Sequence, residues 1–216
     1  MNTIEIELKK YFQLQKYRPE LFKESDLLPI ELDIKVIEKY MADTGKQIGV
    51  LYDSPYHMLI VDLIHDEKND KYYTYERIVS PSNDAVVIVP MYNGNFVLLN
   101  QFRHSLRDFQ YAFPRGFGEF GISAENNARK EIKEELGVDA KTFSLLGTIV
   151  ADSGLCGDTV YVYTCEIDAP KISKGYEGIE SVFIKTEVEF SDMIKQNQIT
   201  DGFTLSAYSL YISNRK

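Results

Sequence analysis

The segment from Asp84 to Pro90 constrains the fold of this 216-residue chain more than any other. Residues 85–89 are all apolar, whereas a strand with one solvated face alternates apolar and polar residues. The run fits a strand that is covered on both faces, and only its short length separates it from a buried helix. It therefore predicts the central strand of a mixed sheet.

Further strands and helices are predicted on both sides of this segment. The Asn93-Gly94 pair predicts a hairpin turn, because both residues tolerate positive φ. One helix has clear ends, with Ser123 as its N-cap and Gly137 at its C-terminal stop. Strands are predicted at residues 50–52, 58–64, 72–79, 85–91, 96–102, 143–150, 159–167 and 181–185, and helices at about 124–136, 190–196 and 201–213.

The first 45 residues differ from the rest of the chain. Apolar residues from Leu8 to Leu14 predict a short amphipathic helix, and Pro19 and Pro29 break the segment into pieces. We expect a helical extension over residues 1–45 that packs on another part of the protein. A single domain over residues 46–216 follows, and its first part, 46–80, is a separate β element.

Composition excludes several classes of function. The chain carries 24 Lys and Arg against 33 Asp and Glu, a net charge of −9, which argues against a duplex nucleic acid partner. The apolar runs fall short of the ~18 residues of a membrane helix. Cys156 and Cys165 have no metal-ligand spacing and favour a reducing compartment. We therefore expect a cytoplasmic protein that makes no contact with membranes.

Three glutamates gather on the helix predicted at residues 124–136. Glu131, Glu134 and Glu135 are related as i, i+3 and i+4, so their carboxylates share one face. Repulsion at these spacings costs about 0.2–0.5 kcal/mol per pair, and a divalent cation would reverse it. Carboxylate oxygens are the ligands that Mg²⁺ prefers, with Mn²⁺ as an alternative. The competing interpretation is a solvated helix face, because Glu and Lys are good helix formers.

The glycine-rich loop and this helix together resemble the Nudix box. The residues that match its pattern are Gly116, Glu131, Ile132, Glu134, Glu135, Gly137 and Val138. Ile122 stands where the box has its first Glu, and Lys130 stands where it has Arg, two positions that brace the loop in the family. Inward packing of Ile122, or polar contacts from Arg115, Glu119 or Arg129, must then hold the loop. The resemblance implies an α/β fold, the Nudix α/β/α sandwich with a mixed sheet, preceded by an N-terminal extension.

The resemblance also implies roles for individual residues. Glu131, Glu135 and the Arg115 carbonyl are expected to bind the metal, and Glu134 to assist catalysis. Gln101-Phe102-Arg103 resembles a substrate-contacting Gln-aromatic-Arg, so Arg103 is expected to bind substrate together with Gly116. A late loop is expected to supply the general base, Glu177, with Glu180 as the alternative.

The expected activity is Mg²⁺-dependent hydrolysis of the pyrophosphate bond of a nucleoside diphosphate linked to another group. ADP-ribose is the first expected substrate, and nucleotide sugars come next. The resembling subgroup also implies a homodimer that uses the β element 46–80. The departures at Ile122 and Lys130 motivate an alternative, a catalytically silent nucleotide-binding domain that acts as a sensor or scaffold. A third hypothesis is an acidic interaction protein outside the family.

Overall fold

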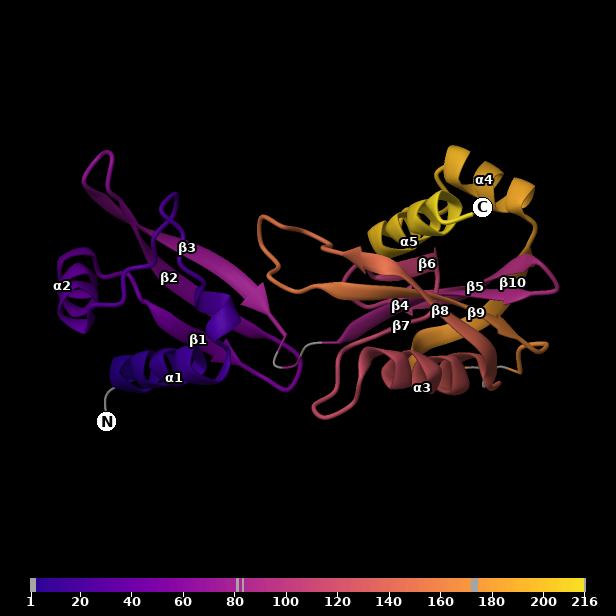
Figure 1. The fold of residues 1–216 in the computed structure, drawn as a ribbon, viewed down its shortest axis with the longest axis horizontal. Helices are drawn as coiled ribbons and strands as arrows, with labels where there is room; N and C mark the ends of the chain where they lie inside the picture. The colour runs from indigo at the N-terminus through magenta and orange to yellow at the C-terminus, as the bar shows by residue number, and fades with distance from the viewer. Residues whose placement is uncertain (1–2, 81, 83, 172–174, 216) are drawn as a thin grey trace. The chain divides into compact units, whose positions relative to one another are not determined.

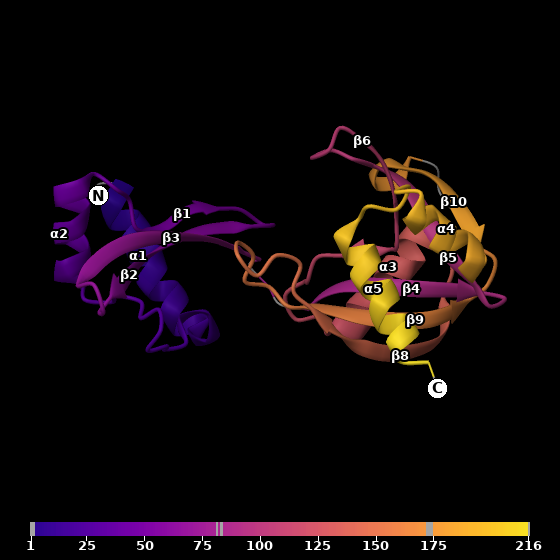
Figure 2. The same cartoon turned by 90° about the horizontal axis from the view of Figure 1, so that it is seen from above.

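The computed structural model describes residues 3–80, 82, 84–171 and 175–215. Backbone contacts divide the chain into two compact units, each built around its own sheet (Figures 1 and 2). We call Met1–Pro81 with Asp152–Gly157 the N-terminal unit, and Ser82–Ala151 with Asp158–Lys216 the C-terminal unit. The predicted helical extension and the predicted β element thus share one unit. The assignment of that β element to a domain over residues 46–216 stays a prediction.

The N-terminal unit is a three-stranded antiparallel sheet in the order β1-β2-β3, accompanied by helices. The predicted amphipathic helix forms, and its fully buried Tyr11 donates a hydrogen bond to Asp62 at 2.5 Å. Arg77 pairs with the same carboxylate at 2.6 Å, so a buried polar network ties the helix to the sheet. The elements are α1 (Thr3–Tyr17), η1 (Pro19–Phe22), α2 (Ile34–Thr44), β1 (Gly49–Asp53), β2 (Met58–Asp66) and β3 (Lys71–Val79).

The C-terminal unit is built on a seven-stranded sheet with the main order β10-β5-β4-β9-β8. β4 runs parallel to β9 and antiparallel to β5, so the prediction of a central strand in a mixed sheet is confirmed. Strand β6 extends the sheet at β5, and the short β7 pairs with β4. The elements are β4 (Ala85–Tyr92), β5 (Asn95–Arg103), β6 (Asp108–Ala112), β7 (Arg115–Gly116), α3 (Ala124–Leu136), β8 (Ala140–Ile149), β9 (Val160–Ile167), η2 (Tyr176–Gly178), β10 (Ile179–Lys185), α4 (Glu187–Lys195) and α5 (Gly202–Ser213).

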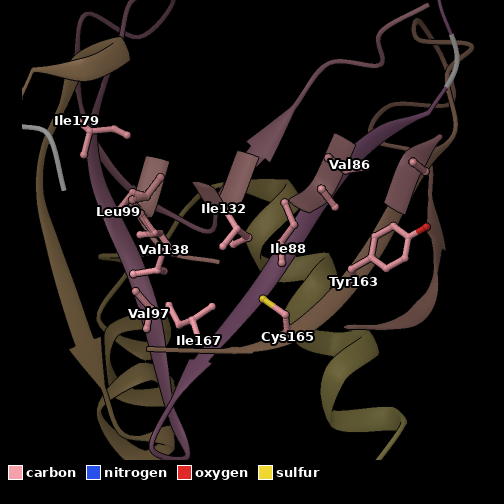
Figure 3. Close-up of a cluster of buried hydrophobic side chains, with 13 residues drawn as sticks. Val86, Ile88, Val97, Leu99, Ile132, Val138, Tyr163, Cys165, Ile167 and Ile179 are labelled. Atoms are coloured by element: carbon pink, nitrogen blue, oxygen red, sulfur yellow. The ribbon is translucent and has the colours of Figure 1, made fainter. Parts of the chain in front are cut away.

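Helices cover both faces of this sheet, with α3 on one face and α5 on the other (Figures 1 and 2). Successive side chains of β4 alternate between the two cores, as the period of a strand requires. Val86 and Ile88 pack with Ile132 of α3, and Figure 3 shows these side chains converging with those of β5 and β9. Val87 and Val89 lie in the opposite core with residues of α4 and α5. This three-layer arrangement is the expected α/β/α sandwich.

The structure adds elements that the sequence did not predict. Helix α2 lies in a segment of mixed Lys, Glu and apolar residues, yet Asp33 caps it and Ile37 is fully buried. Strand β6 was missed because Asp108–Ala112 is short and largely exposed. Within the described residues, no helix is long and apolar enough to cross a membrane.

Candidate active site

Helix α3 has the predicted ends and an apolar face that anchors it to the sheet. The side chain of Ser123 accepts a hydrogen bond from the Asn126 N–H, and Gly137 ends the helix with a φ of 66°. An apolar stripe at every fourth position is buried against the sheet, consisting of Ala124, Ala128, Ile132 and Leu136. This packing sets the rotation of the helix and therefore the direction of its glutamates.

Two of the three glutamates are buried beside that stripe. Glu131 is 9% exposed and Glu135 only 2%, whereas Glu134 is partly exposed. The solvated-face interpretation is therefore wrong for Glu131 and Glu135. One oxygen of Glu135, Oε2, is buried and finds no hydrogen-bond partner within the described part of the chain. A buried, unpaired carboxylate oxygen is costly, and such groups concentrate at functional sites.

Strand β7 lies directly against these two carboxylates. A Cβ atom added to Gly116 would lie 2.0 Å from Oε1 of Glu131, so only glycine leaves room for the carboxylate. The backbone N–H of Arg115 hydrogen-bonds to the carboxylate of Glu135. The two residues of β7 and the two buried glutamates therefore form one packed group.

Burial disfavours the charged forms of both glutamates. Desolvation raises the pKa of Glu131 to about 7, with Lys130 partly offsetting the rise. Desolvation likewise raises the pKa of Glu135 to about 8, and the neighbouring charge of Glu131 adds to it while Arg103 opposes it. Without a counter-charge the two carboxyl groups therefore favour their protonated forms, and a bound cation would stabilise the ionised forms instead.

The donor set suits a divalent metal. Across residues 3–80, 82, 84–171 and 175–215, no three acidic, His or Cys side chains already form a group arranged around a common ion position. Two buried carboxylates one helical turn apart are nevertheless present, and Oε2 of Glu135 lacks a partner. Hard divalent cations are bound by such oxygens with waters and substrate phosphates completing the shell. Glu131 and Glu135 therefore fit a Mg²⁺ or Mn²⁺ ion.

The late loop brings Glu177 to this group. Glu177 lies in η2, and its charge raises the pKa of both Glu131 and Glu135. Its backbone carbonyl accepts a hydrogen bond from Nε2 of Gln101 at 2.9 Å. Glu180, the other candidate base, instead accepts a hydrogen bond from Asn100 at 3.2 Å.

Glu134 contacts the late loop at Tyr176 and is not part of the buried pair. Its Oε2 accepts a hydrogen bond from the Tyr176 hydroxyl at 3.3 Å, and Lys130 lies 3.5 Å away. The third glutamate of the helix therefore connects α3 to η2. Its partial exposure leaves it accessible to a bound ligand.

Arg103 ends β5 beside the carboxylates. Its Nε and Nη2 atoms are buried and have no hydrogen-bond partner in the part of the chain that the structure describes. Desolvation lowers its pKa, and the nearby guanidinium of Arg115 lowers it further, whereas Asp201 and Glu135 raise it. Nε and Nη2 form one edge of the guanidinium fork, which matches two oxygens of a phosphate.

The side chain of Arg115 faces α5 and not the glutamates. It pairs with Asp201 at 3.3 Å, and its guanidinium carbon lies 4.6 Å from the centre of the Phe203 ring. Asp201 also caps α5 by accepting a hydrogen bond from the N–H of Thr204. Any metal contact from Arg115 must therefore come from its carbonyl.

The loop before α3 is braced by residues outside the usual box positions. Lys130 forms an ion pair with Glu119, so a carboxylate three positions before Ile122 replaces the expected one. The fully buried Asn127 donates to the carbonyls of Phe117 at 2.7 Å and Asp84 at 3.2 Å. Glu119 was among the predicted braces, whereas Asn127 was missed. Its position one turn before Glu131 was the available signal.

The other two predicted braces serve elsewhere. Arg129 pairs with Glu125 at 2.7 Å and lies over the ring of Phe143, while Arg115 pairs with Asp201. The structure thus brings together Glu131, Glu135, Glu177, Arg103 and Gly116. Glu134 and Lys130 lie at the margin of this group.

Comparison with known proteins supplies a family context. Residues 81–189, half of the chain, match the sequence profile of the NUDIX domain. An ADP-sugar pyrophosphatase of Mus musculus is 32% identical over 92 residues, which cover 40% of this chain and 42% of that protein. The ADP compounds hydrolase NudE of Escherichia coli (strain K12) is 29% identical over 72 residues, covering 33% of this chain and 39% of that protein. The chain therefore spans about two fifths of the length of these curated relatives.

A solved structure shares the fold. The crystal structure of an ADP compounds hydrolase aligns with a TM-score of 0.65 over 76% of this chain and 89% of the other. Their sequences are 19% identical, so the likeness concerns architecture alone.

Proposed function

The chain belongs to the Nudix family, and from that premise we propose that it hydrolyses the pyrophosphate bond of a nucleoside diphosphate linked to another group. The observation that carries the proposal is the buried pair Glu131 and Glu135, which lies against Gly116 and has one carboxylate oxygen without a hydrogen-bond partner among the residues that the structure describes. A purely structural helix face has no reason to bury two acids and to leave a buried carboxylate oxygen without a partner.

Glu131 and Glu135 would hold Mg²⁺, or Mn²⁺ in its place, together with the carbonyl of Arg115. Such an ion would supply neutralisation of the charge on the diphosphate and polarisation of its phosphorus centres. With an ion present, both glutamates stay ionised despite their burial. Gly116 leaves room for the Glu131 carboxylate, beside the residue whose carbonyl would join the two glutamates in holding the ion.

Glu177 is the proposed general base. It would accept a proton from a water whose oxygen bonds to one phosphorus. The bond from that phosphorus to the bridging oxygen breaks, and the bridging oxygen leaves with the other phosphate, which gives two phosphate monoesters. Arg103 would pair with a non-bridging phosphate oxygen through its unpartnered Nε and Nη2 edge. Glu134 would assist from the margin of the site, where it also holds Tyr176.

ADP-ribose is the first proposed substrate, with nucleotide sugars next. The names of two relatives, an ADP-sugar pyrophosphatase and an ADP compounds hydrolase, support this substrate class. We also propose a homodimer that uses the β element 46–80, and a cytoplasmic location. Both follow from the family resemblance.

Incubation with ADP-ribose and Mg²⁺, followed by chromatography of the products, tests the activity. AMP and ribose 5-phosphate are the expected products, and a panel of nucleotide sugars ranks the substrates. Binding of ADP-ribose without turnover, with every panel member also uncleaved, would instead establish the silent sensor or scaffold.

A further inference from the structure

Gln101 is a buried polar residue that joins the sheet to the Glu177 loop. Its side chain, on β5, is 3% exposed. Nε2 donates to the backbone carbonyl of Glu177 at 2.9 Å across 76 residues of sequence. Oε1 is buried and has no hydrogen-bond partner among the described residues. Half of this amide therefore holds the loop, while the other half is unpaired at a cost to stability.

The loop that Gln101 holds has a strained backbone. Glu177 has a φ of 44° and a ψ of 32°, in the left-handed region that non-glycine residues rarely occupy. Gly178, with a φ of 81°, lies so close to β5 that an added Cβ would be 3.0 Å from the carbonyl oxygen of Phe102. Strained backbone of this kind persists only where surrounding contacts determine it.

Two side-chain contacts determine this conformation from opposite ends. Gln101 holds the carbonyl of Glu177 at β5, and Tyr176 donates its hydroxyl to Glu134 of α3. Between them the loop spans from the sheet to the glutamate-bearing helix. The backbone of Glu177 is thus held on one side through its own carbonyl and on the other through the side chain of Tyr176.

We propose that Gln101 is a positioning residue for Glu177, holding its backbone on β5 so that its carboxylate faces Glu131 and Glu135. This inference rests on the proposed function, in which Glu177 takes the proton from the attacking water. A residue kept only for stability would not leave a buried amide oxygen unpaired. The unpaired amide oxygen lowers stability, and we infer that the residue is kept because the proposed hydrolysis needs it.

The test substitutes Gln101→Met in the full chain. The substitution keeps the side-chain length and removes both the donor nitrogen and the acceptor oxygen of the amide. We expect kcat for ADP-ribose, or for the best nucleotide sugar, to fall by about tenfold to hundredfold, because a misplaced base is a poor one. KM should stay within about twofold, and the thermal midpoint should not fall, because the unpaired oxygen is also removed. An unchanged kcat, or a fall in kcat matched by a fall in thermal stability, overturns the proposal.

Asn100→Leu is the matched control. Asn100 is the neighbouring residue on β5 and makes the equivalent amide contact, at 3.2 Å, to Glu180 on β10. Its loss should leave kcat within about twofold of the parent, since its partner Glu180 is not the proposed base. An equal loss of kcat in both variants would mean that any weakened contact between β5 and the late loop reduces turnover, which overturns a specific role for Gln101.

A double-variant cycle separates this inference from the proposed function. If Gln101 acts through Glu177, adding Gln101→Met to Glu177→Gln should lower kcat no further. Additive losses overturn the positioning role. If Glu177→Gln alone leaves kcat unchanged while Glu135→Gln abolishes turnover, the assignment of the base is wrong and the positioning role is overturned with it. If the parent enzyme cleaves no substrate in the panel, the proposed function itself has failed.

Discussion

Gly116→Ala tests the packing of the candidate site most sharply. The added Cβ would lie 2.0 Å from Oε1, 2.3 Å from Cδ and 2.6 Å from Cγ of Glu131. Ordinary van der Waals contact begins at 3.4 Å, so the carboxylate must retreat by about 1.4 Å or β7 must move away from β4. Overpacking of this kind costs about 1–3 kcal/mol. A displacement of about 1 Å in a catalytic group also lowers turnover by about a hundredfold.

The assay is steady-state hydrolysis of ADP-ribose, or of the best substrate in the panel, together with the thermal midpoint with and without Mg²⁺. We expect the variant to lose most of its activity and most of the stabilisation that Mg²⁺ gives the parent. Adding Glu131→Asp, which withdraws the carboxylate by one methylene, should restore thermal stability without restoring turnover. Gly202→Ala is the control, because an added Cβ there meets nothing within 4 Å. Parental turnover and Mg²⁺ stabilisation in Gly116→Ala would refute the reasoning.

Three further predictions concern charge around the site. Without a divalent ion, the raised pKa values of Glu131 and Glu135, about 7 and about 8, mean that the folded chain binds protons that the unfolded chain has released. The free energy of unfolding should therefore fall as pH rises from about 5 to about 8. Mg²⁺ should raise the thermal midpoint more at about pH 8 than at about pH 5. A thermal midpoint that does not change with pH would contradict the raised pKa values of the buried glutamates. Lys130→Glu should lower turnover only severalfold by breaking the loop brace, since exposed ion pairs contribute about 0.2–1 kcal/mol. Adding Glu119→Lys reverses the pair and should restore most of the turnover. No rescue would mean that this ion pair is not the brace. Arg103→Lys keeps the charge but loses the fork, so KM for the diphosphate should rise by about tenfold in steady-state kinetics, and an unchanged KM would remove Arg103 from the phosphate contact.

The sequence was informative where local chemistry decides structure. Helix α3 begins after Ser123 and ends at Gly137 as predicted, because capping depends on residues within one turn of the helix end. The apolar run 85–89 became the central strand of the mixed sheet, because its uniform pattern admits no solvated face. The burial of Glu131 and Glu135 was harder to foresee, since their spacing alone also fits a solvent-facing stripe.

Contacts between residues distant in sequence were beyond prediction. The hydrogen bond from Gln101 to the Glu177 carbonyl joins residues 76 positions apart, and no periodic pattern reports such a pair. The choice between Glu177 and Glu180 depends on a bend at Glu177 with positive φ, which its residue type does not signal. Asn127 was missed for a related reason. Its side chain donates hydrogen bonds to two backbone carbonyls that come within reach only in the folded protein.

Crystals of the protein soaked with Mn²⁺ and a non-hydrolysable ADP-ribose analogue provide the most direct test of the metal assignment. Anomalous scattering locates the manganese ions independently of the protein atoms. We predict manganese bound by the carboxylates of Glu131 and Glu135, with the diphosphate of the analogue beside it. Manganese bound elsewhere, with these two carboxylates still buried and unliganded, would contradict the account.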